Sequence, residues 1–439
     1  MYKIGDNIIS SLGFSTEENF SAVKQGISGI KYYDAGVFDL PEPFMASLID
    51  NEKLNDEFAH HCGTKDYTDL EKAAILSVLS ANKEPQIDLS NPKTIFILSS
   101  TKGNVELLDM RQIDMRYEMG KNPKSQISNP KSQIYLWHTA ELIAGFFGNP
   151  NTPIIVSNAC ISGAAAQIVA KRELESGKYD NAVVVGVDFL SKFIISGFQS
   201  FKALSPELCR PFDKNRRGLN LGEAAATMIF SRDMRRLDMK RLDVRHEKVF
   251  SLVAGAVRND ATHISAPSRT GEGSYRALQV ILNSQIPNPN SQISILNSQI
   301  AFINAHGTAT PYNDAMEMNA IVRAGLEAVP VNALKSYFGH TLGAAGVVET
   351  IISMHALSEG LVLKTLGFEE SEQLAINNEQ YVLDICKENR ATDKKYFIKL
   401  MSGFGGVNVA LLFCNELRSG GFTRLRHPIH FPTSNQRQK

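Results

Sequence analysis

The sequence contains few of the residues that mark a metal-binding or disulfide-bonded protein. Only five of its 439 residues are cysteine, and they are widely spaced with no Cys-x-x-Cys pair: Cys62, Cys160, Cys209, Cys386 and Cys414. An odd number of scattered cysteines argues against a disulfide framework or a zinc site, and it favours a reducing compartment. We therefore expect no resident metal ion.

The chain also lacks an excess of charge of either sign and any long apolar run. Lys and Arg together number 46, as do Asp and Glu, so the formal net charge is zero. This balance gives no electrostatic basis for binding nucleic acid or an anionic membrane. No apolar run approaches the length of a bilayer span, and the residues after Met1 lack the apolar core of a secretion signal. We expect a soluble, cytoplasmic protein that binds neither nucleic acid nor membrane.

The most informative stretch places a cysteine where a strand is expected to turn into a helix. The β-branched run 154–156 leads to Cys160, and the small residues 162–166 follow. The first turn of a helix leaves backbone N–H groups free and carries the positive end of the helix dipole, which favours thiolate over thiol. This position predicts a nucleophile. A buried structural cysteine is an equal alternative for Cys160 alone, so the interpretation depends on two histidines.

Each histidine lies at a junction flanked by glycine. His306 ends a predicted strand over 300–306 and is followed by a glycine and two hydroxyl residues, Thr308 and Thr310. His340 lies five residues after Lys335, in a glycine-rich stretch predicted to form a helix over 339–357. Either histidine alone is more often structural than catalytic. Together with Cys160, they suit acyl transfer to sulfur followed by chemistry on an enolate.

The order of predicted elements indicates an α/β protein with two similar halves. The first half shows a helix over 66–82 and a strand over 94–100, and then a helix over 164–177 before a strand over 181–187. The second half has the strand that ends at His306, a helix over 314–326 and two strands within 396–414 around a glycine turn. Strand–helix–strand units in both halves indicate one architecture used twice, with a join near 235–250.

Short repeats interrupt this pattern. The sequence of 122–127 recurs in 129–134, and related short sequences recur within 283–300. A different short sequence occurs twice within 236–244. Repeats this short cannot form a structural unit, so we interpret them as insertions in surface loops. We predict an N-terminal half over 1–240 with an insertion at about 121–134, a C-terminal half over 241–415 with an insertion at about 283–300, and a loose basic tail over 416–439.

From residue 13 to about residue 413, apart from the repeats, the sequence resembles the β-ketoacyl-[acyl-carrier-protein] synthases, which are condensing enzymes of the thiolase-fold superfamily. The resemblance implies a thiolase-like fold with layers in the order α-β-α-β-α. The motifs that carry it occur in the family's order, and they are Asn158-Ala159-Cys160, Arg210-Pro211-Phe212-Asp213 with Gly222-Glu223, Asn304 to Thr310, Lys335 to Gly346, and Gly403 to Asn408.

The family's chemistry assigns a role to each matched residue. The resemblance implies that Cys160 takes an acyl group from acyl carrier protein, and that His306 and His340 bind the malonyl thioester and promote its decarboxylation. The backbone N–H groups of Cys160 and Phe404 would bind the oxyanion, and Phe404 would also gate the site.

Further matched residues are implied to support this site. Lys335 would pair with Glu317, Thr308 and Thr310 would bind the phosphopantetheine arm, and Glu349 would lie near the substrate. The implied partners are acyl carrier protein and a second copy of the chain, or a second ketosynthase-like subunit. No cofactor is implied beyond the phosphopantetheine of the carrier protein.

Three functions stay open at this point. The first is elongation in fatty-acid biosynthesis. The second is a ketosynthase of a polyketide or aryl-polyene pathway, which is suggested by Ser402 before the Gly-Phe-Gly-Gly turn and by the bulky Ile161 after the nucleophile. The third is a non-catalytic partner that resembles a chain-length factor, although such proteins normally lack the nucleophile.

The strand that opens the fold in this family is also predicted to be abbreviated here.

Overall fold

A computed structural model describes residues 1–63, 66–83, 87–108, 134–233, 248–284, 298–371, 374–376 and 379–417. The predicted loop insertions fall almost entirely outside these ranges, as do the 236–244 repeat and the tail from residue 418 onward. The predicted boundary between residues 240 and 241 also lies outside the described residues. The domain limits therefore stay a prediction.

The first half of the chain supplies five neighbouring strands of a ten-stranded sheet. β5, β4 and β6 are parallel, and β8 runs antiparallel to both β6 and β1. Every residue of β4 is buried, as expected for a strand covered on both faces. In order across the sheet, the strands are β5 (Ile154–Val156), β4 (Thr94–Ser99), β6 (Asn181–Asp188), β8 (Ala224–Ser231) and β1 (Tyr2–Ser10).

The second half repeats this arrangement strand for strand. β11, β10 and β16 are parallel, and β17 runs antiparallel to both β16 and β9. The halves join where Tyr2 of β1 pairs with Ser251 of β9. The predicted pair of similar α/β halves is thus confirmed. In order, the strands are β11 (Val331–Asn332), β10 (Ile300–Asn304), β16 (Tyr396–Gly403), β17 (Val407–Leu417) and β9 (Lys248–Asn259).

Two helices form the layer between the halves: α6 (Ser162–Glu175) and α12 (Ala345–Ser358). α6 contacts β4 and β6 from the first half and β9 and β17 from the second, and α12 likewise contacts strands of both halves. Small and apolar residues dominate both helices, and most are buried. The helices can therefore pack against two sheet faces at once.

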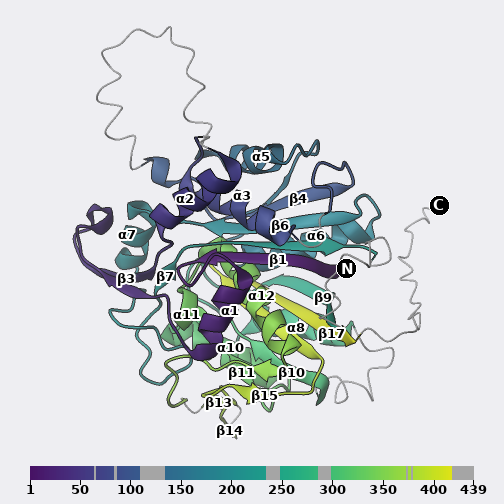
Figure 1. Cartoon of the computed structure of the whole chain (residues 1–439). Helices are drawn as coiled ribbons and strands as arrows, with labels where there is room; N and C mark the ends of the chain where they lie inside the picture. Colours follow the sequence, from purple (N-terminus) through teal and green to yellow (C-terminus); the bar gives the residue numbers. More distant parts are fainter. Residues whose placement is uncertain are drawn as a thin grey trace, which may run out of the picture.

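Other helices cover the outer faces of the sheet (Figure 1). α2 (Asn51–Cys62), α3 (Asp69–Ala81) and α5 (Leu136–Phe146) lie over the first half, and α8 (Glu272–Asn283) and α10 (Pro311–Arg323) over the second. The predicted α-β-α-β-α layering is confirmed. Within the described ranges, no helix is both long and apolar enough to cross a membrane.

Shorter elements complete the fold around these layers. They are α1 (Thr16–Gln25), α7 (Lys192–Ser200), α11 (Lys335–Phe338), the 3₁₀ turns Val37–Asp39 and Leu342–Ala344, and three small sheets formed by β2 (Lys31–Tyr33), β3 (Phe44–Ser47) and β7 (Leu221–Gly222), by β12 (Leu361–Val362) and β15 (Arg390–Ala391), and by β13 (Leu374–Ile376) and β14 (Glu379–Tyr381).

Two predictions about secondary structure are wrong. The helix predicted over 339–357 begins only at Ala345, because Gly339 and Leu342 have φ angles of 67° and 49°, which lie outside the helical region. The opening strand is not abbreviated, since β1 spans nine residues and pairs along its length with β8. The predicted helix over 66–82 and the strand over 94–100 are confirmed within three residues, as α3 and β4.

The two central helices meet at glycines. A Cβ on Gly163 would lie 2.7 Å from the carbonyl oxygen of Gly343, and a Cβ on Gly346 would lie 2.3 Å from the amide nitrogen of Ala164. Side chains cannot approach backbone atoms this closely, so the crossing requires glycine. The contact brings the start of α6, just after Cys160, against the start of α12.

We expect Gly346→Ala to lower the free energy of unfolding by about 1–3 kcal/mol, because the added methyl group overpacks this crossing. The matched control is Gly197→Ala within α7, where a Cβ meets nothing within 4 Å. Alanine loses less conformational entropy on folding than glycine does. The free energy of unfolding of the control should therefore stay the same or rise by up to about 1 kcal/mol. Denaturant unfolding followed by circular dichroism measures both, and equal midpoints would contradict this account of the crossing.

Candidate active site

Cys160 lies in a tight elbow between β5 and α6. Ala159, directly before it, has a φ of 46°, which is unusual for a residue with a side chain. The hydroxyl of Ser162 fastens the turn, because it accepts a hydrogen bond from the Asn158 amide (2.7 Å) and donates one to the Ala159 carbonyl (2.6 Å). The elbow predicted from the sequence is confirmed.

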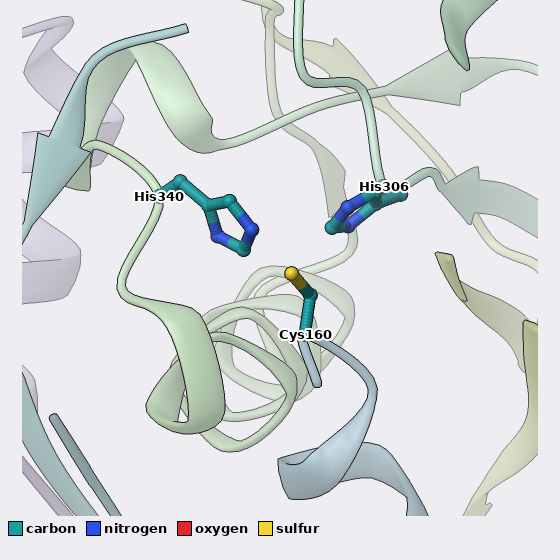
Figure 2. A group of neighbouring side chains, drawn as sticks. All are labelled: Cys160, His306 and His340. Carbon is teal, nitrogen blue, oxygen red and sulfur yellow. The ribbon is translucent and has the colours of Figure 1, made fainter. Parts of the chain in front are cut away.

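The structure brings both predicted histidines to the cysteine. His306 follows β10 and His340 lies between α11 and α12, and Figure 2 shows the two rings and the Cys160 sulfur pointing toward one another. The sulfur and one nitrogen of each ring all lie within 4.8 Å of one another. The ring planes are nearly perpendicular, at 82°, with centroids 5.2 Å apart. All three side chains are buried.

Hydrogen bonding indicates where the proton of His340 lies. Its Nδ1 accepts a hydrogen bond from the Leu342 amide at 3.3 Å, so in the neutral ring the proton is on Nε2. Among the described residues, His340 Nε2 and His306 Nδ1 are buried without a hydrogen-bond partner. Buried polar atoms are normally paired, so the free Nε2–H is available to a bound molecule.

Both imidazoles are held in the neutral form. Burial, followed by the charge of Lys335, lowers the pKa of His306 well below its usual value. The same two effects, in the same order, lower the pKa of His340. Near neutral pH each ring can therefore donate one N–H without carrying a charge.

The state of the cysteine differs from the expectation. Burial raises the pKa of the Cys160 thiol to about 11, and the charges of Lys335 and Lys102 offset this only in part. The predicted preference for thiolate is therefore wrong for the protein without substrate, because desolvation of the sulfur outweighs the nearby positive charge. The thiol must lose its proton as it reacts, and a neutral imidazole is close enough to assist.

The predicted pairing of Lys335 with Glu317 is also wrong. The ammonium group of Lys335 donates to Glu349 (2.7 Å) and to the carbonyl of His306 (2.7 Å). Glu317 instead accepts hydrogen bonds from the backbone amides of His306 and Gly307, both at 2.7 Å. Glu317 lies on the helix that begins directly after this loop, and its carboxylate therefore reaches backbone amides instead of the lysine.

Glu349 is enclosed by two lysines. One of its carboxylate oxygens binds Lys335 and the other binds Lys399, and all three side chains are buried. Although burial opposes ionisation, the two ammonium groups hold the pKa of Glu349 below its usual value. The predicted role of Glu349 in substrate binding has no support in these contacts, because both oxygens are already bound.

The remaining predicted residues lie around the site. Thr308 is buried, and its hydroxyl lies 2.8 Å from the hydroxyl of Thr310, the residue at the N-cap position of α10. The ring of Phe404 is partly exposed and rests against Phe198 and Phe201 at centroid distances of 6.2 and 5.9 Å. Phe404 therefore lies beside α7, outside the group formed by the cysteine and the two histidines.

Sequence reasoning missed two charged residues near the site. Lys399 interrupts the apolar strand 396–401, and Asp188 ends the apolar strand 181–187. Asp188 accepts hydrogen bonds from Ser100 (2.7 Å) and from the amide of Gly343 (2.6 Å), so it ties the end of β4 to the segment after His340. A charged residue within or directly after a buried strand was the available signal for both.

Cys160, His306 and His340 also offer ligand atoms close enough together to hold a metal ion. Thiolate and imidazole are common zinc ligands. A metal ion here would occupy the sulfur to which the family resemblance assigns acyl transfer, and under that assignment the arrangement suits a nucleophile beside two hydrogen-bond donors better than a resident metal ion.

Comparison with known proteins supports this description. The family model "Beta-ketoacyl synthase, N-terminal domain" matches residues 85–235, and "Beta-ketoacyl synthase, C-terminal domain" matches residues 250–369. The chain is 26% identical to 3-oxoacyl-[acyl-carrier-protein] synthase 2 of Vibrio harveyi, over 93% of this chain and 97% of that protein.

Solved structures agree on the fold. A beta-ketoacyl synthase from Burkholderia phymatum is similar with a TM-score of 0.75 and 25% identity, over 95% of this chain and all of that one. A chain of the ishigamide ketosynthase/chain length factor gives a TM-score of 0.78 at 22% identity, over 94% of this chain and 98% of that one. With its cysteine, its two histidines and both family domains in place, this chain belongs to the beta-ketoacyl synthase family.

Proposed function

We propose that this protein is a 3-oxoacyl-[acyl-carrier-protein] synthase that lengthens acyl chains by two carbons in fatty-acid biosynthesis. The observation that carries the proposal is the approach of the Cys160 sulfur and two neutral imidazoles to within 4.8 Å of one another. Acyl transfer needs a nucleophile, and decarboxylation needs uncharged donors for an enolate oxygen. This site supplies both.

In the first step, the sulfur of Cys160 attacks the thioester of an acyl carrier protein. The thiol proton leaves by way of a neighbouring imidazole and ends on the sulfur of the departing phosphopantetheine. The backbone amides of Cys160 and Phe404 would bind the tetrahedral oxyanion. In support, a Cβ on Gly403 would lie 3.2 Å from the Cys160 amide nitrogen, so the turn that leads to Phe404 passes beside that amide.

In the second step, malonyl carrier protein enters with its thioester carbonyl toward His306 and His340. Their N–H groups stabilise the enolate that forms as CO₂ leaves, and the enolate carbon attacks the acyl–Cys160 carbonyl. Collapse of the tetrahedral intermediate expels the Cys160 thiolate, which takes a proton from solvent. Neutral rings suit this role, because an imidazolium is acidic enough to protonate the carbanion and stop the condensation.

The proposal includes the partners and the location. The acyl carrier protein delivers both substrates on its phosphopantetheine arm, for which the paired hydroxyls of Thr308 and Thr310 are available. No other cofactor is required, and the cytoplasm is the proposed compartment. A second copy of the chain is the proposed subunit partner, because β5 is a sheet-edge strand whose three apolar residues are only half-buried.

A ketosynthase of a polyketide or aryl-polyene pathway is the second candidate. The feature that suggests it is Ser402, directly before the glycine turn. Its side chain is buried, and its hydroxyl donates a hydrogen bond to Asn408 at 2.9 Å. The second subunit would then be a chain-length factor, as in the ishigamide complex. A non-catalytic role for this chain is disfavoured because the cysteine and both histidines are present.

Replacing either histidine should separate the two steps. We expect His306→Ala and His340→Ala to retain acylation of Cys160, because the remaining imidazole can still accept the thiol proton. Each should lower the rate of malonyl decarboxylation by about 10²–10³, the usual cost of losing one oxyanion donor. The rates are measured by mass spectrometry of the protein and by release of CO₂ from malonyl carrier protein.

The control for these variants is His60→Ala on the exposed face of α2, which should match the unmodified protein. A panel of saturated and polyunsaturated acyl carrier proteins separates the two candidate pathways. Failure of the unmodified protein to form a product two carbons longer from any donor would reject the proposal.

The high pKa of Cys160 predicts slow alkylation at neutral pH. We expect the rate of modification by iodoacetamide to rise about tenfold per pH unit from pH 7 to pH 10, since only the thiolate reacts and burial places the pKa at about 11. Peptide mass mapping of residue 160 measures this rate. A plateau below pH 8 would instead mean that the resting site holds a thiolate.

A further inference from the structure

A second buried lysine contacts the segment that carries His306. Lys399 lies on β16 between apolar neighbours, and its side chain is fully buried. Its ammonium group donates to the carbonyl of Ala305 at 3.2 Å and to the carboxylate of Glu349. Burying a lysine costs free energy unless an opposite charge and hydrogen-bond acceptors compensate its ammonium group.

The two lysines share the end of β10 between them. Lys399 binds the carbonyl of Ala305, and Lys335 binds the next carbonyl, that of His306. Glu317 takes the amides of His306 and Gly307. Consecutive peptide groups on both sides of His306 are therefore fixed by charged side chains. The ring of His306 can hold its place opposite Cys160 only as firmly as this backbone is held.

Glu349 supplies one negative charge to the two ammonium groups that it binds. The carboxylate of Glu317 also lies near Lys399, but burial raises the pKa of Glu317 to about 7, whereas burial lowers the pKa of Lys399 only to about 8. Below about pH 7 one positive charge is therefore left in a buried place beside the rings. Positive charge near an imidazole disfavours its protonation, and positive charge near an enolate stabilises it. Burial and the charge of Lys335 are the larger influences on the pKa of His306, and Lys399 adds to them in the same direction.

We propose that Lys399 is a positioning residue for condensation, which fixes the backbone that carries His306 and keeps both imidazoles uncharged beside the forming enolate. This inference rests on the proposed function. It assigns a role to the strand that leads into the glycine turn 403–406, because Lys399 joins that strand directly to the strand that ends before His306.

Other charged and titratable groups also act on His306, and an experiment on Lys399 must leave them in place. They come from five other segments, and they are Lys335 on α11, Glu317 on α10, Glu349 on α12, His340 on the loop before α12, and Cys160 at the elbow. The charge of Lys102, on the loop after β4, also acts on His340. Lys335 still neutralises Glu349 when Lys399 is replaced.

The test compares Lys399→Met with the unmodified chain over pH 5 to 9. Each protein is acylated at Cys160 and given malonyl carrier protein, and mass spectrometry then measures 3-oxoacyl and acetyl carrier proteins separately. Acetyl carrier protein arises when the enolate takes a proton instead of attacking the acyl group. We expect the midpoint at which acetyl product overtakes 3-oxoacyl product to move upward by about one pH unit in the variant. The initial acylation of Cys160 should stay within about threefold.

Two further variants separate charge from structure. Lys399→Gln keeps a donor for Ala305 but loses the charge, so it should show the same upward shift even if Lys399→Met folds poorly. Lys394→Met is the matched control, because Lys394 also binds a β10 carbonyl, that of Ile300, but at the far end of the strand. Its product ratio should be unchanged at every pH.

The outcomes distinguish this inference from the proposed function. If the unmodified protein forms neither product, the proposed function fails and the role of Lys399 fails with it. If the unmodified protein condenses normally and both Lys399 variants keep its pH midpoint, Lys399 has a merely structural role and the inference is overturned. A uniform loss of rate with no change in product ratio would overturn it as well.

Discussion

The ion pair of Glu349 with two buried lysines is the interaction on which the geometry of the site depends. Lys335 comes from α11, Lys399 from β16 and Glu349 from α12, so the group ties three separate segments together. Removing Glu349 would leave two buried ammonium groups without a counter-charge, and an uncompensated buried charge typically costs about 3–5 kcal/mol. Lys335 also binds the carbonyl of His306, and Lys399 binds that of Ala305. A stable ion-pair group therefore holds the backbone of His306, and with it the ring, in a fixed position.

The internal repeat explains why Cys160 and His340 meet. β5 and β11 hold equivalent places at the outer ends of the two five-strand sets. Cys160 follows the first and the segment of His340 follows the second, and each leads into one of the two central helices. Because those helices cross closely at glycines, the segment before α6 and the segment before α12 lie next to each other, although they come from opposite halves of the chain. Cys160 and His340 thus occupy equivalent positions in the internal repeat of the fold.

Sequence patterns predicted the layers, the elbow and the grouping of Cys160 with two histidines, because apolar runs that end at glycine-flanked polar residues are local features. Which side chains pair with one another was harder to predict from the sequence. The resemblance implies that Lys335 pairs with Glu317, but Lys335 binds Glu349, since the choice depends on how α10 and α12 pack. Lys399 was missed because one lysine within an apolar strand does not reveal what it faces. The thiolate expected at Cys160 was wrong, since its burial depends on both halves together.

The central claim is that both imidazoles stay neutral while they face the cysteine. Nitrogen NMR of protein labelled at histidine tests it directly, with the signals assigned by their loss in His306→Gln and His340→Gln. We expect both rings to show neutral nitrogen shifts at pH 6, with the proton of His340 on Nε2, because burial and Lys335 lower the pKa of each ring. Imidazolium signals from either ring at pH 6 would contradict the account.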